Sequence, residues 1–339
     1  MELLLVHHEV FGRHKASSRQ HPERPDRLRA VLAGLDNASV QLNHLLAEPV
    51  DRGNLLRVHP AAYVDSIEAF CRAGGGYLDP DTYAGLASWE AARRAAGAGI
   101  QAVAGLRHGA ADLAFLAVRP PGHHAIASQA MGFCLFNNVA VTARHLTDAG
   151  ERVAIVDFDV HHGNGTQDLF FEDPDVLYLS LHEFPFYPGT GWVDELGAGR
   201  GTGFNVNLAF PAGTGGDAYR EAFERLIEPI VRQFDPAWIL VSAGYDAHRD
   251  DPLADGALVA ADYGDMAARI AGLAPERRVI YFLEGGYDLA AIQASVTATV
   301  NGAVGMPVSS GDIGTVSPSA AGRAIDLAVD ALSPFWEIG

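Results

Sequence analysis

Cysteine, long apolar runs and basic residues are all scarce in this sequence of 339 residues. The two cysteines, Cys71 and Cys134, lie far apart and form no CxxC motif, which argues against a disulfide scaffold and for a reducing compartment. No stretch of about 18 apolar residues free of charge occurs, so we expect no membrane span. The N-terminal segment MELLLVHHEV has a short apolar run without a basic flank, which predicts a first strand rather than a signal peptide. A cytoplasmic protein is therefore expected.

The shortage of basic residues gives the chain an acidic balance. Lysine and arginine together number 24, against 42 aspartates and glutamates, for a formal net charge of −18. Such a chain should repel nucleic acid and attract cationic substrates or peptides, although solubility alone accounts for most of these charges. Hydrophobic residues make up 48% and charged residues 19%, which permits a large core and argues against disorder. We expect a globular protein with no nucleic-acid partner.

Strand-like and helix-like segments alternate along the chain. Candidate strands span residues 113–118, 153–158, 176–181, 205–208, 238–243 and 279–283. Several are apolar at both odd and even positions, as expected for strands that are covered on both faces. Candidate helices span residues 89–106, 135–149, 217–234 and 260–271. The alternation predicts an α/β fold, with a parallel sheet and helices on both sides of it.

Nothing in the sequence divides the chain into separate domains, since it contains no internal repeat and no low-complexity linker. The stretch 308–319, rich in Ser, Gly and Pro, is the best linker candidate, and it should precede a C-terminal helix near 320–332. We therefore expect one domain over residues 1–339. Ligands of open α/β sheets bind beyond the carboxyl ends of the strands, so a polar motif is informative when it follows a strand.

The densest such motif is DFDVHHGNG, which begins inside the predicted strand 153–158 and continues into glycines. Because side chains alternate along a strand, Asp157, Asp159 and His161 can face the same side. Two carboxylates and an imidazole are costly to bury there without a cation or a tight hydrogen-bond network. An Asp/His set suits zinc, and a catalytic zinc keeps one position open for water. The alternative is a polar strand end with capping residues.

Three further motifs follow predicted strands. RPPGHH places His123 and His124 after strand 113–118, as metal ligands, general bases or surface residues. SAGYDAH places Asp246 after strand 238–243, although an Asp in that position is often only a helix cap. LEGGY places Tyr287 after strand 279–283, where paired glycines allow its hydroxyl to lie over a site or form a plain turn. All four motifs fall at one edge of the predicted sheet and together supply the parts of metal-assisted hydrolysis.

These motifs resemble those of the zinc-dependent histone deacetylase family, which belongs to the arginase–deacetylase superfamily. The matching segments occur in order over most of the chain. They are HPERPDRL (21–28), RPPGHHA (119–125), MGFCLFNN (131–138), DFDVHHGNGTQD (157–168), SLH (180–182), YPGTG (187–191), AGYDAHRDDPL (243–253) and LEGGY (283–287). The GNG form resembles the class II and bacterial amidohydrolase branch. The resemblance implies a single α/β domain around an eight-stranded, mainly parallel sheet.

The resemblance also implies roles for individual residues. The implied ligands of one catalytic zinc are Asp159, His161 and Asp246. The implied catalytic residues are the tandem histidines His123 and His124, their respective partners Asp157 and Asn164, and Tyr287, which polarises the substrate carbonyl. The implied substrate-binding residues are Asp81, Gly132, Phe133, Tyr187 and Leu253.

Structural potassium or sodium ions are a further implication of the resemblance. The implied first site uses Asp157, Ser180 and the backbone carbonyls of Asp159, His161 and Leu181. The implied second site uses carbonyls near Phe170, Asp173 and Val176. Because any residue supplies a carbonyl, a sequence pattern alone does not reveal such ligands.

The motifs and the resemblance predict a zinc-dependent amidohydrolase that acts on linear amides. Zinc activates a water, His124 with or without His123 takes its proton, and Tyr287 stabilises the oxyanion. The resemblance implies a narrow apolar tunnel at the site, and an acyl-lysine peptide and an acylated polyamine or similar small amine both suit such a tunnel. Leu253 favours acyl-lysine, because polyamine-selective relatives can place an acid there, whereas the acidic net charge favours a polyamine. A homo-oligomer is left open.

Two other functions are compatible with parts of the pattern. A binuclear manganese ureohydrolase would need additional Asp/His ligands for its second metal, and Asn164 and Tyr287 fit one zinc better. A non-catalytic module that binds acyl-lysine would be expected to have lost Tyr287 or a zinc ligand, and the sequence retains all of them.

Overall fold

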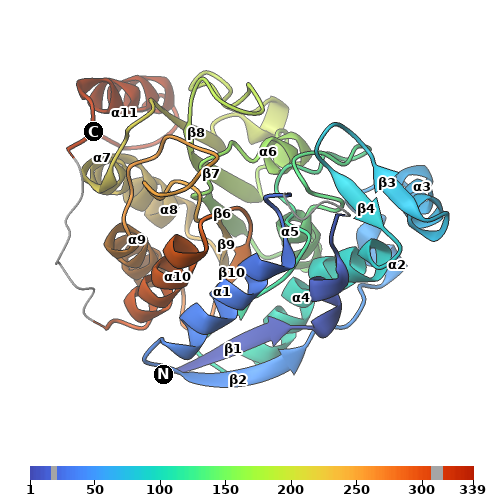
Figure 1. Ribbon diagram of the computed structural model, residues 1–339. Helices are drawn as coiled ribbons and strands as arrows, with labels where there is room; N and C mark the ends of the chain where they lie inside the picture. The colour runs from blue at the N-terminus through green and yellow to red at the C-terminus, as the bar shows by residue number, and fades with distance from the viewer. Residues whose placement is uncertain (17–20, 307–315) are drawn as a thin grey trace.

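The computed structural model describes residues 1–16, 21–306 and 316–339. Its centre is an eight-stranded sheet with the order β2-β1-β5-β10-β9-β6-β7-β8, in which every neighbouring pair is parallel (Figure 1). The strands are β1 (Glu2–His7), β2 (Gln41–Leu46), β5 (Leu113–Leu116), β6 (Val153–Asp157), β7 (Val176–Glu183), β8 (Asn205–Phe210), β9 (Trp238–Ala243) and β10 (Val279–Leu283). A separate antiparallel hairpin pairs β3 (Gly75–Tyr77) with β4 (Tyr83–Gly85). The predicted parallel sheet is confirmed.

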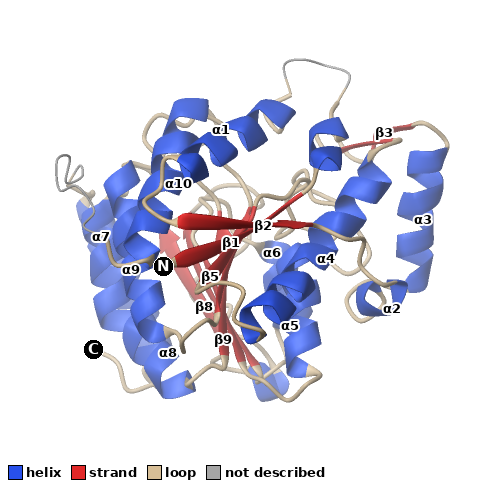
Figure 2. Cartoon of the chain, turned by 90° about the horizontal axis from the view of Figure 1, so that it is seen from below, coloured by secondary structure: helices blue, strands red, loops and turns tan. Residues whose placement is uncertain are grey.

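Helices cover both faces of the sheet (Figure 2). One layer contains α1 (Pro25–Asp36), α7 (Gly216–Ala222), α8 (Glu228–Phe234), α9 (Ala260–Leu273) and α10 (Leu289–Ala303). The other contains α4 (Ser88–Arg107) and α5 (Asn138–Thr147), with α6 (Asn164–Phe170), α2 (Arg52–Leu55) and α3 (Ala61–Arg72) packed beside them. The last helix, α11 (Ser319–Leu332), packs against the edge strand β8 and against α7.

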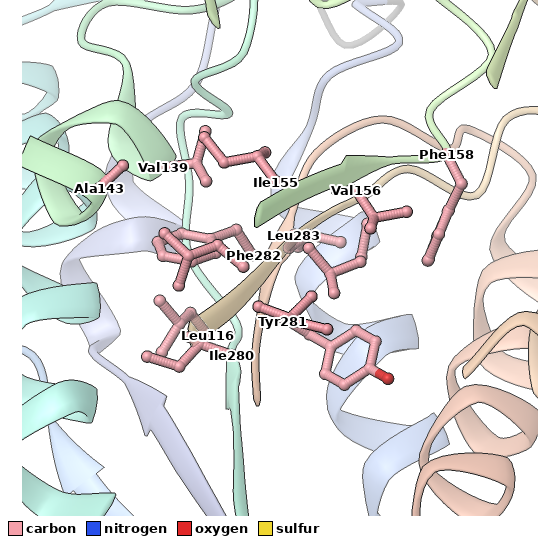
Figure 3. Close-up of a cluster of buried hydrophobic side chains, with 14 of the residues drawn as sticks. Leu116, Val139, Ala143, Ile155, Val156, Phe158, Ile280, Tyr281, Phe282 and Leu283 are labelled. Atoms are coloured by element: carbon pink, nitrogen blue, oxygen red, sulfur yellow. The ribbon is translucent and has the colours of Figure 1, made fainter. Parts of the chain in front are cut away.

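The central strands are buried on both of their faces. Every residue of β5, β6, β9 and β10 is buried. Within β10, Phe282 lies on the side of Val139 and α5, while Tyr281 points to the opposite face (Figure 3). Burying one large apolar side chain contributes roughly 1.5–3 kcal/mol. This two-sided core is the physical reason why the strand sequences are apolar at both odd and even positions.

The structure shifts the ends of several predicted elements. The helix expected from residue 135 begins at Asn138, because the side chain of Asn137 accepts a hydrogen bond from the Ala140 amide and caps the helix. The helix expected over 217–234 contains a π-helical segment, Phe223–Ile227, between α7 and α8. Strand β5 ends two residues earlier than expected, and β7 continues to Glu183. The patterns missed β2, because this half-exposed edge strand is partly polar.

The C-terminal region closes one edge of the sheet. Of the predicted linker 308–319, residues 308–315 lie outside the described residues, and α11 begins at Ser319. The Trp336 side chain donates a hydrogen bond to the Gly203 carbonyl, just before β8. Within the described ranges, no helix is long and apolar enough to cross a membrane.

Candidate active site

The four polar motifs meet because the strands that precede them are neighbours in space. The sheet order places β5, β10, β9 and β6 side by side, although they follow one another in the chain as β5, β6, β9 and β10. Since all four strands run parallel, their carboxyl ends lie at one edge. The tandem histidines, the Asp/His set, Asp246 and Tyr287 leave the sheet at this edge, where ligands of open α/β sheets bind.

Asp159, His161 and Asp246 form a compact group that could hold a metal ion. Their ligand atoms all lie within 4.8 Å of one another. The Nδ1 atom of His161 is 3.1 Å from Asp159 Oδ1 and 3.1 Å from Asp246 Oδ2. The remaining carboxylate oxygens are fixed by the backbone, since Gly285 N–H donates to Asp159 Oδ2 and Val160 N–H donates to Asp246 Oδ1. Both carboxylates are fully buried, whereas the His161 side chain is 12% exposed, so it is His161 that gives the group access to solvent.

The electrostatics of this group favour a cation. Burial lowers the pKa of His161, but Asp246 and Asp159 outweigh it and raise the pKa to about 10. Burial and the charge of Asp159 raise the pKa of Asp246 above its ordinary value. Two buried carboxylates therefore demand positive charge at the point where His161 meets them. Two oxygens and one nitrogen form a ligand set that zinc accepts, with a further position open.

Two glycines make room for this group. A Cβ atom on Gly285 would lie 2.0 Å from Asp246 Oδ2, and one on Gly244 would lie 2.0 Å from Asp159 Oδ2. Any other residue at either position would displace a carboxylate. The glycines of SAGYD and LEGGY are therefore needed for close approach of the backbone to the candidate metal ligands, which adds to the fit for a metal.

The tandem histidines lie beside the metal-ligand group with their rings 4.0 Å apart. His123 Nδ1 is 3.0 Å from Asp157 Oδ2, which also accepts a hydrogen bond from the Tyr178 hydroxyl. His124 Nδ1 is 2.9 Å from the Asn164 side-chain oxygen. Since that amide oxygen only accepts, Nδ1 of His124 carries the hydrogen and Nε2 keeps a free lone pair.

The two histidines are held in different charge states. Burial lowers the pKa of His123, but Asp159 and Asp157 outweigh it and raise the pKa to about 10. Burial, then the positive charge of His123, holds the pKa of His124 well below its ordinary value. The pair therefore combines one charged and one neutral imidazole, which suits a proton donor and a proton acceptor side by side.

Tyr287 and several aromatic side chains line a narrow cavity of about 230 Å³ above these groups. The cavity is lined by Asp81, Pro121, His123, His124, Gly132, Phe133, His161, Phe186, Tyr187, Leu253, Gly285 and Tyr287. Burial raises the pKa of Tyr287 well above its ordinary value, so its hydroxyl keeps its proton and can donate a hydrogen bond. All five expected substrate-binding residues thus border one cavity with the histidines and Tyr287.

The sequence patterns missed Phe186, which stacks on the His161 ring at 5.4 Å with an interplanar angle of 22°. The only signal was its position directly before the YPGTG segment. The expected cation ligands Ser180 and Leu181 are buried in β7, and the Ser180 hydroxyl lies 2.9 Å from His182 Nδ1. Near the other expected site, the Asp173 carboxylate pairs with Arg144. Both cation sites remain predictions.

A second missed feature is a buried charge cluster that includes Arg119 of the RPPGHHA segment. The Glu23 carboxylate pairs with Arg119, with Arg27 at 3.1 Å and with His14 Nε2 at 3.5 Å. Glu23, Arg27 and Arg119 are all buried. Burial raises the pKa of Glu23, but Arg119 and His14 outweigh it and hold the pKa well below its ordinary value. Glu23 and Arg27 of the HPERPDRL segment thus form a structural ion network with Arg119 of the RPPGHHA segment.

We expect Glu23→Gln to lower the free energy of unfolding by about 3 kcal/mol at pH 7, because it leaves buried cations uncompensated. Glu23 has a depressed pKa when folded, so its contribution is complete above the ordinary value of 4.5 and disappears as pH falls through the folded pKa. Urea unfolding of both proteins at pH 7, 5 and 3.5 should show a difference that narrows below about pH 4.5. Glu9→Gln, which alters an exposed ion pair, should match the wild type.

Comparisons with known proteins agree with this architecture. The family model described as Histone deacetylase domain matches residues 21–303. Histone deacetylase 15 of Arabidopsis thaliana is 40% identical over 347 residues, which cover 99% of this chain and 61% of that protein. This chain thus spans about three fifths of that relative.

Two further relatives are of more similar length. A probable deacetylase of Archaeoglobus fulgidus is 38% identical and covers 84% of this chain and 81% of its own length. A histone deacetylase-like amidohydrolase of Pseudomonas aeruginosa is 40% identical, with 80% of this chain and 73% of that protein covered. The crystal structure of the HDA15 HD domain superposes with a TM-score of 0.91 at 37% identity, over 99% of this chain and 95% of that one. The chain therefore belongs to the histone deacetylase domain family, whose relatives are named as deacetylases and amidohydrolases.

Proposed function

We propose that this protein is a zinc-dependent deacylase that hydrolyses the amide of acyl-lysine or a similar linear N-acyl amine. The observation that carries the proposal is that His161, a member of the compact Asp159–His161–Asp246 group, lines the same narrow cavity as the tandem histidines and Tyr287. When bound, zinc supplies Lewis-acid polarisation of a carbonyl and lowers the pKa of water. Everything else that the reaction needs comes from side chains around the cavity.

The neutral His124 is placed to act as the general base. Its Nδ1 atom is bound to Asn164, so Nε2 can take a proton from water. His123, whose Nδ1 atom lies 3.0 Å from Asp157, supplies a proton for the leaving amine when it is protonated. The Tyr287 hydroxyl, which keeps its proton, donates a hydrogen bond to the carbonyl oxygen as it becomes negative.

The walls of the cavity favour a linear substrate. The rings of Phe133 and Tyr287 meet edge to face at 6.0 Å, and those of His124 and Tyr187 do so at 5.2 Å. An unbranched aliphatic chain fits between such walls, while Asp81 at the rim can accept hydrogen bonds from a peptide backbone or an ammonium group. Acyl-lysine meets these requirements, and acetylpolyamines meet them in part.

A turnover panel with metal analysis tests the proposal. The zinc-loaded protein is assayed with lysine peptides that carry acyl groups of several lengths and with acetylated putrescine, cadaverine and spermidine. We expect one zinc per chain and release of the acid from at least one acyl-lysine peptide. Peptide binding without turnover would instead support a binding module, and two metals per chain would support a binuclear enzyme.

Leu253 should set the preference between the two substrate classes. Its half-exposed side chain lies at the cavity rim and offers no partner to a second ammonium group. Since an exposed ion pair is worth about 0.2–1 kcal/mol, Leu253→Glu should raise kcat/KM for acetylspermidine about 1.4- to 5-fold relative to an acetyl-lysine peptide. The uncharged control Leu253→Gln should leave this ratio unchanged, and an equal gain in both variants would contradict the explanation.

A further inference from the structure

Glu284, at the end of β10 and three residues before Tyr287, has a carboxylate that faces the tandem-histidine loop. Its Oε2 atom accepts hydrogen bonds from the backbone N–H groups of Gly122 at 2.6 Å and His123 at 3.2 Å. Its Oε1 atom lies 3.4 Å from the Ser242 hydroxyl. The residue is fully buried and does not line the cavity, so it meets the substrate only through the groups that it holds.

The backbone around Glu284 is itself fixed. The N–H group of Gly285 donates to Asp159, one of the candidate zinc ligands. The Arg27 guanidinium donates to the carbonyls of Glu284 and Gly286 on either side. Because the backbone around it is fixed, the Glu284 carboxylate can hold the tandem-histidine loop in one position.

The other end of the tandem-histidine loop is linked to Arg27 through Glu23. Arg119, three residues before Gly122, pairs with Glu23, and Glu23 also pairs with Arg27. A closed ring of buried contacts therefore runs from Glu284 through the histidine loop to Arg119, then through Glu23 and Arg27 back to the Glu284 carbonyl. The ring leaves the loop little freedom to move relative to the zinc ligands.

We propose that Glu284 is a positioning residue, whose carboxylate fixes the distance of His123 and His124 from the Asp159–His161–Asp246 group by accepting both N–H groups of the Gly122–His123 backbone. This inference rests on the proposed function for its kinetic consequences. This positioning role requires an acceptor oxygen on a side chain long enough to reach the two N–H groups. It does not require the negative charge of the carboxylate. A misplacement of about 1 Å in reacting groups can cost about 10²-fold in rate.

Two substitutions separate the effect of the length of the Glu284 side chain from the effect of its negative charge. In Glu284→Gln, the amide oxygen can occupy the Oε2 position and accept both N–H groups, while the amide nitrogen faces Ser242. In Glu284→Asp, the charge remains but the side chain is one methylene too short to reach the loop. We expect Glu284→Gln to keep kcat within about 3-fold of the wild type and Glu284→Asp to lose about 10- to 100-fold. KM should change little in either, because the cavity walls that bind the acyl chain are intact.

Ser242→Ala is the matched control, because it removes the partner of the other carboxylate oxygen and should leave kcat unchanged. Bound zinc and the melting temperature are measured for every variant to show that each is folded and loaded. The reverse order of the two Glu284 variants, or a loss that appears in KM rather than kcat, would overturn the proposal.

Crystal structures of the zinc-loaded variants give a readout that does not depend on turnover. In Glu284→Asp the histidine segment should shift relative to Asp159 by more than about 0.5 Å, the tolerance of a productive site, and in Glu284→Gln it should not. If the shift occurs but the wild type hydrolyses no substrate of the panel, the proposed function fails and the positioning role stands. If the wild type is active and the histidines of Glu284→Asp have not moved, the positioning role fails alone.

Discussion

Tyr287→Phe is expected to lower kcat by about 10²- to 10³-fold while one zinc per chain remains bound. The substitution removes a single hydroxyl group from a side chain that lines the same cavity as the tandem histidines. Burial raises the pKa of Tyr287 and keeps this hydroxyl protonated, so in the proposed mechanism it donates a hydrogen bond to the oxygen that becomes negative in the transition state. Removing one such donor typically costs this factor. KM should change less than kcat, because the bond strengthens only as the charge develops.

Steady-state kinetics on the best acyl-lysine peptide, together with metal analysis, checks this expectation. Tyr281→Phe is a matched control, because the buried Tyr281 hydroxyl has no hydrogen-bond partner among the described residues and lies in the core. It should show wild-type kinetics and equal or slightly higher stability. Full activity in Tyr287→Phe would remove the tyrosine from the mechanism.

Asp246→Asn should abolish measurable turnover, with a loss of about 10³-fold or more, because it weakens one of three candidate metal ligands. It should also remove most of the stabilising effect of zinc. A ligand that binds only the folded state at a thousand times its Kd stabilises by about 4 kcal/mol, so zinc should raise the melting temperature of the wild type but scarcely that of the variant. Without zinc, the variant should melt no lower than the wild type, since burial and then the charge of Asp159 raise the pKa of Asp246 and so disfavour its ionised carboxylate in the folded protein.

Thermal melting with chelator and with added zinc measures both effects in one experiment. Asp250→Asn is the control on the same loop, because the Asp250 side chain is 65% exposed and lies outside the metal-ligand group. It should respond to zinc as the wild type does. An unchanged zinc response in Asp246→Asn would show that the metal does not bind through this residue.

Much of the fold could be predicted from the sequence because its central strands are buried on both faces. Seven strands were recognisable as apolar runs, namely the N-terminal strand and the six later ranges, and each lies within or close to its predicted position. The edge strand β2 and the short hairpin β3–β4 were not recognisable, because their positions are partly exposed and carry little periodic signal. Helix ends were displaced where a side-chain cap such as Asn137 decided them.

The residues of the candidate site also differ in how well the sequence alone predicts them. Asp159 and His161 are close in sequence, so strand alternation alone predicts that they face one side. Asp246 reads equally well as a helix cap, and only the placement of β9 between β6 and β10 brings it to within 3.1 Å of His161. For Phe186 the only signal was its position before the YPGTG segment, because its stacking on the His161 ring depends on how the loop folds back over the sheet.

The sequence by itself determined the parallel α/β fold, the chemical types gathered at one edge of the sheet, and their resemblance to a metal-dependent deacetylase. Only the tertiary structure decided which side chains fix the positions of the tandem histidines and of the loop that carries them. The contact of Glu284 with the His123 backbone, and that of Glu23 with Arg119, join residues 161 and 96 positions apart. The physical reason is that local periodicity specifies which face of an element is buried, whereas the partner of a buried charge is set by the order in which the strands assemble.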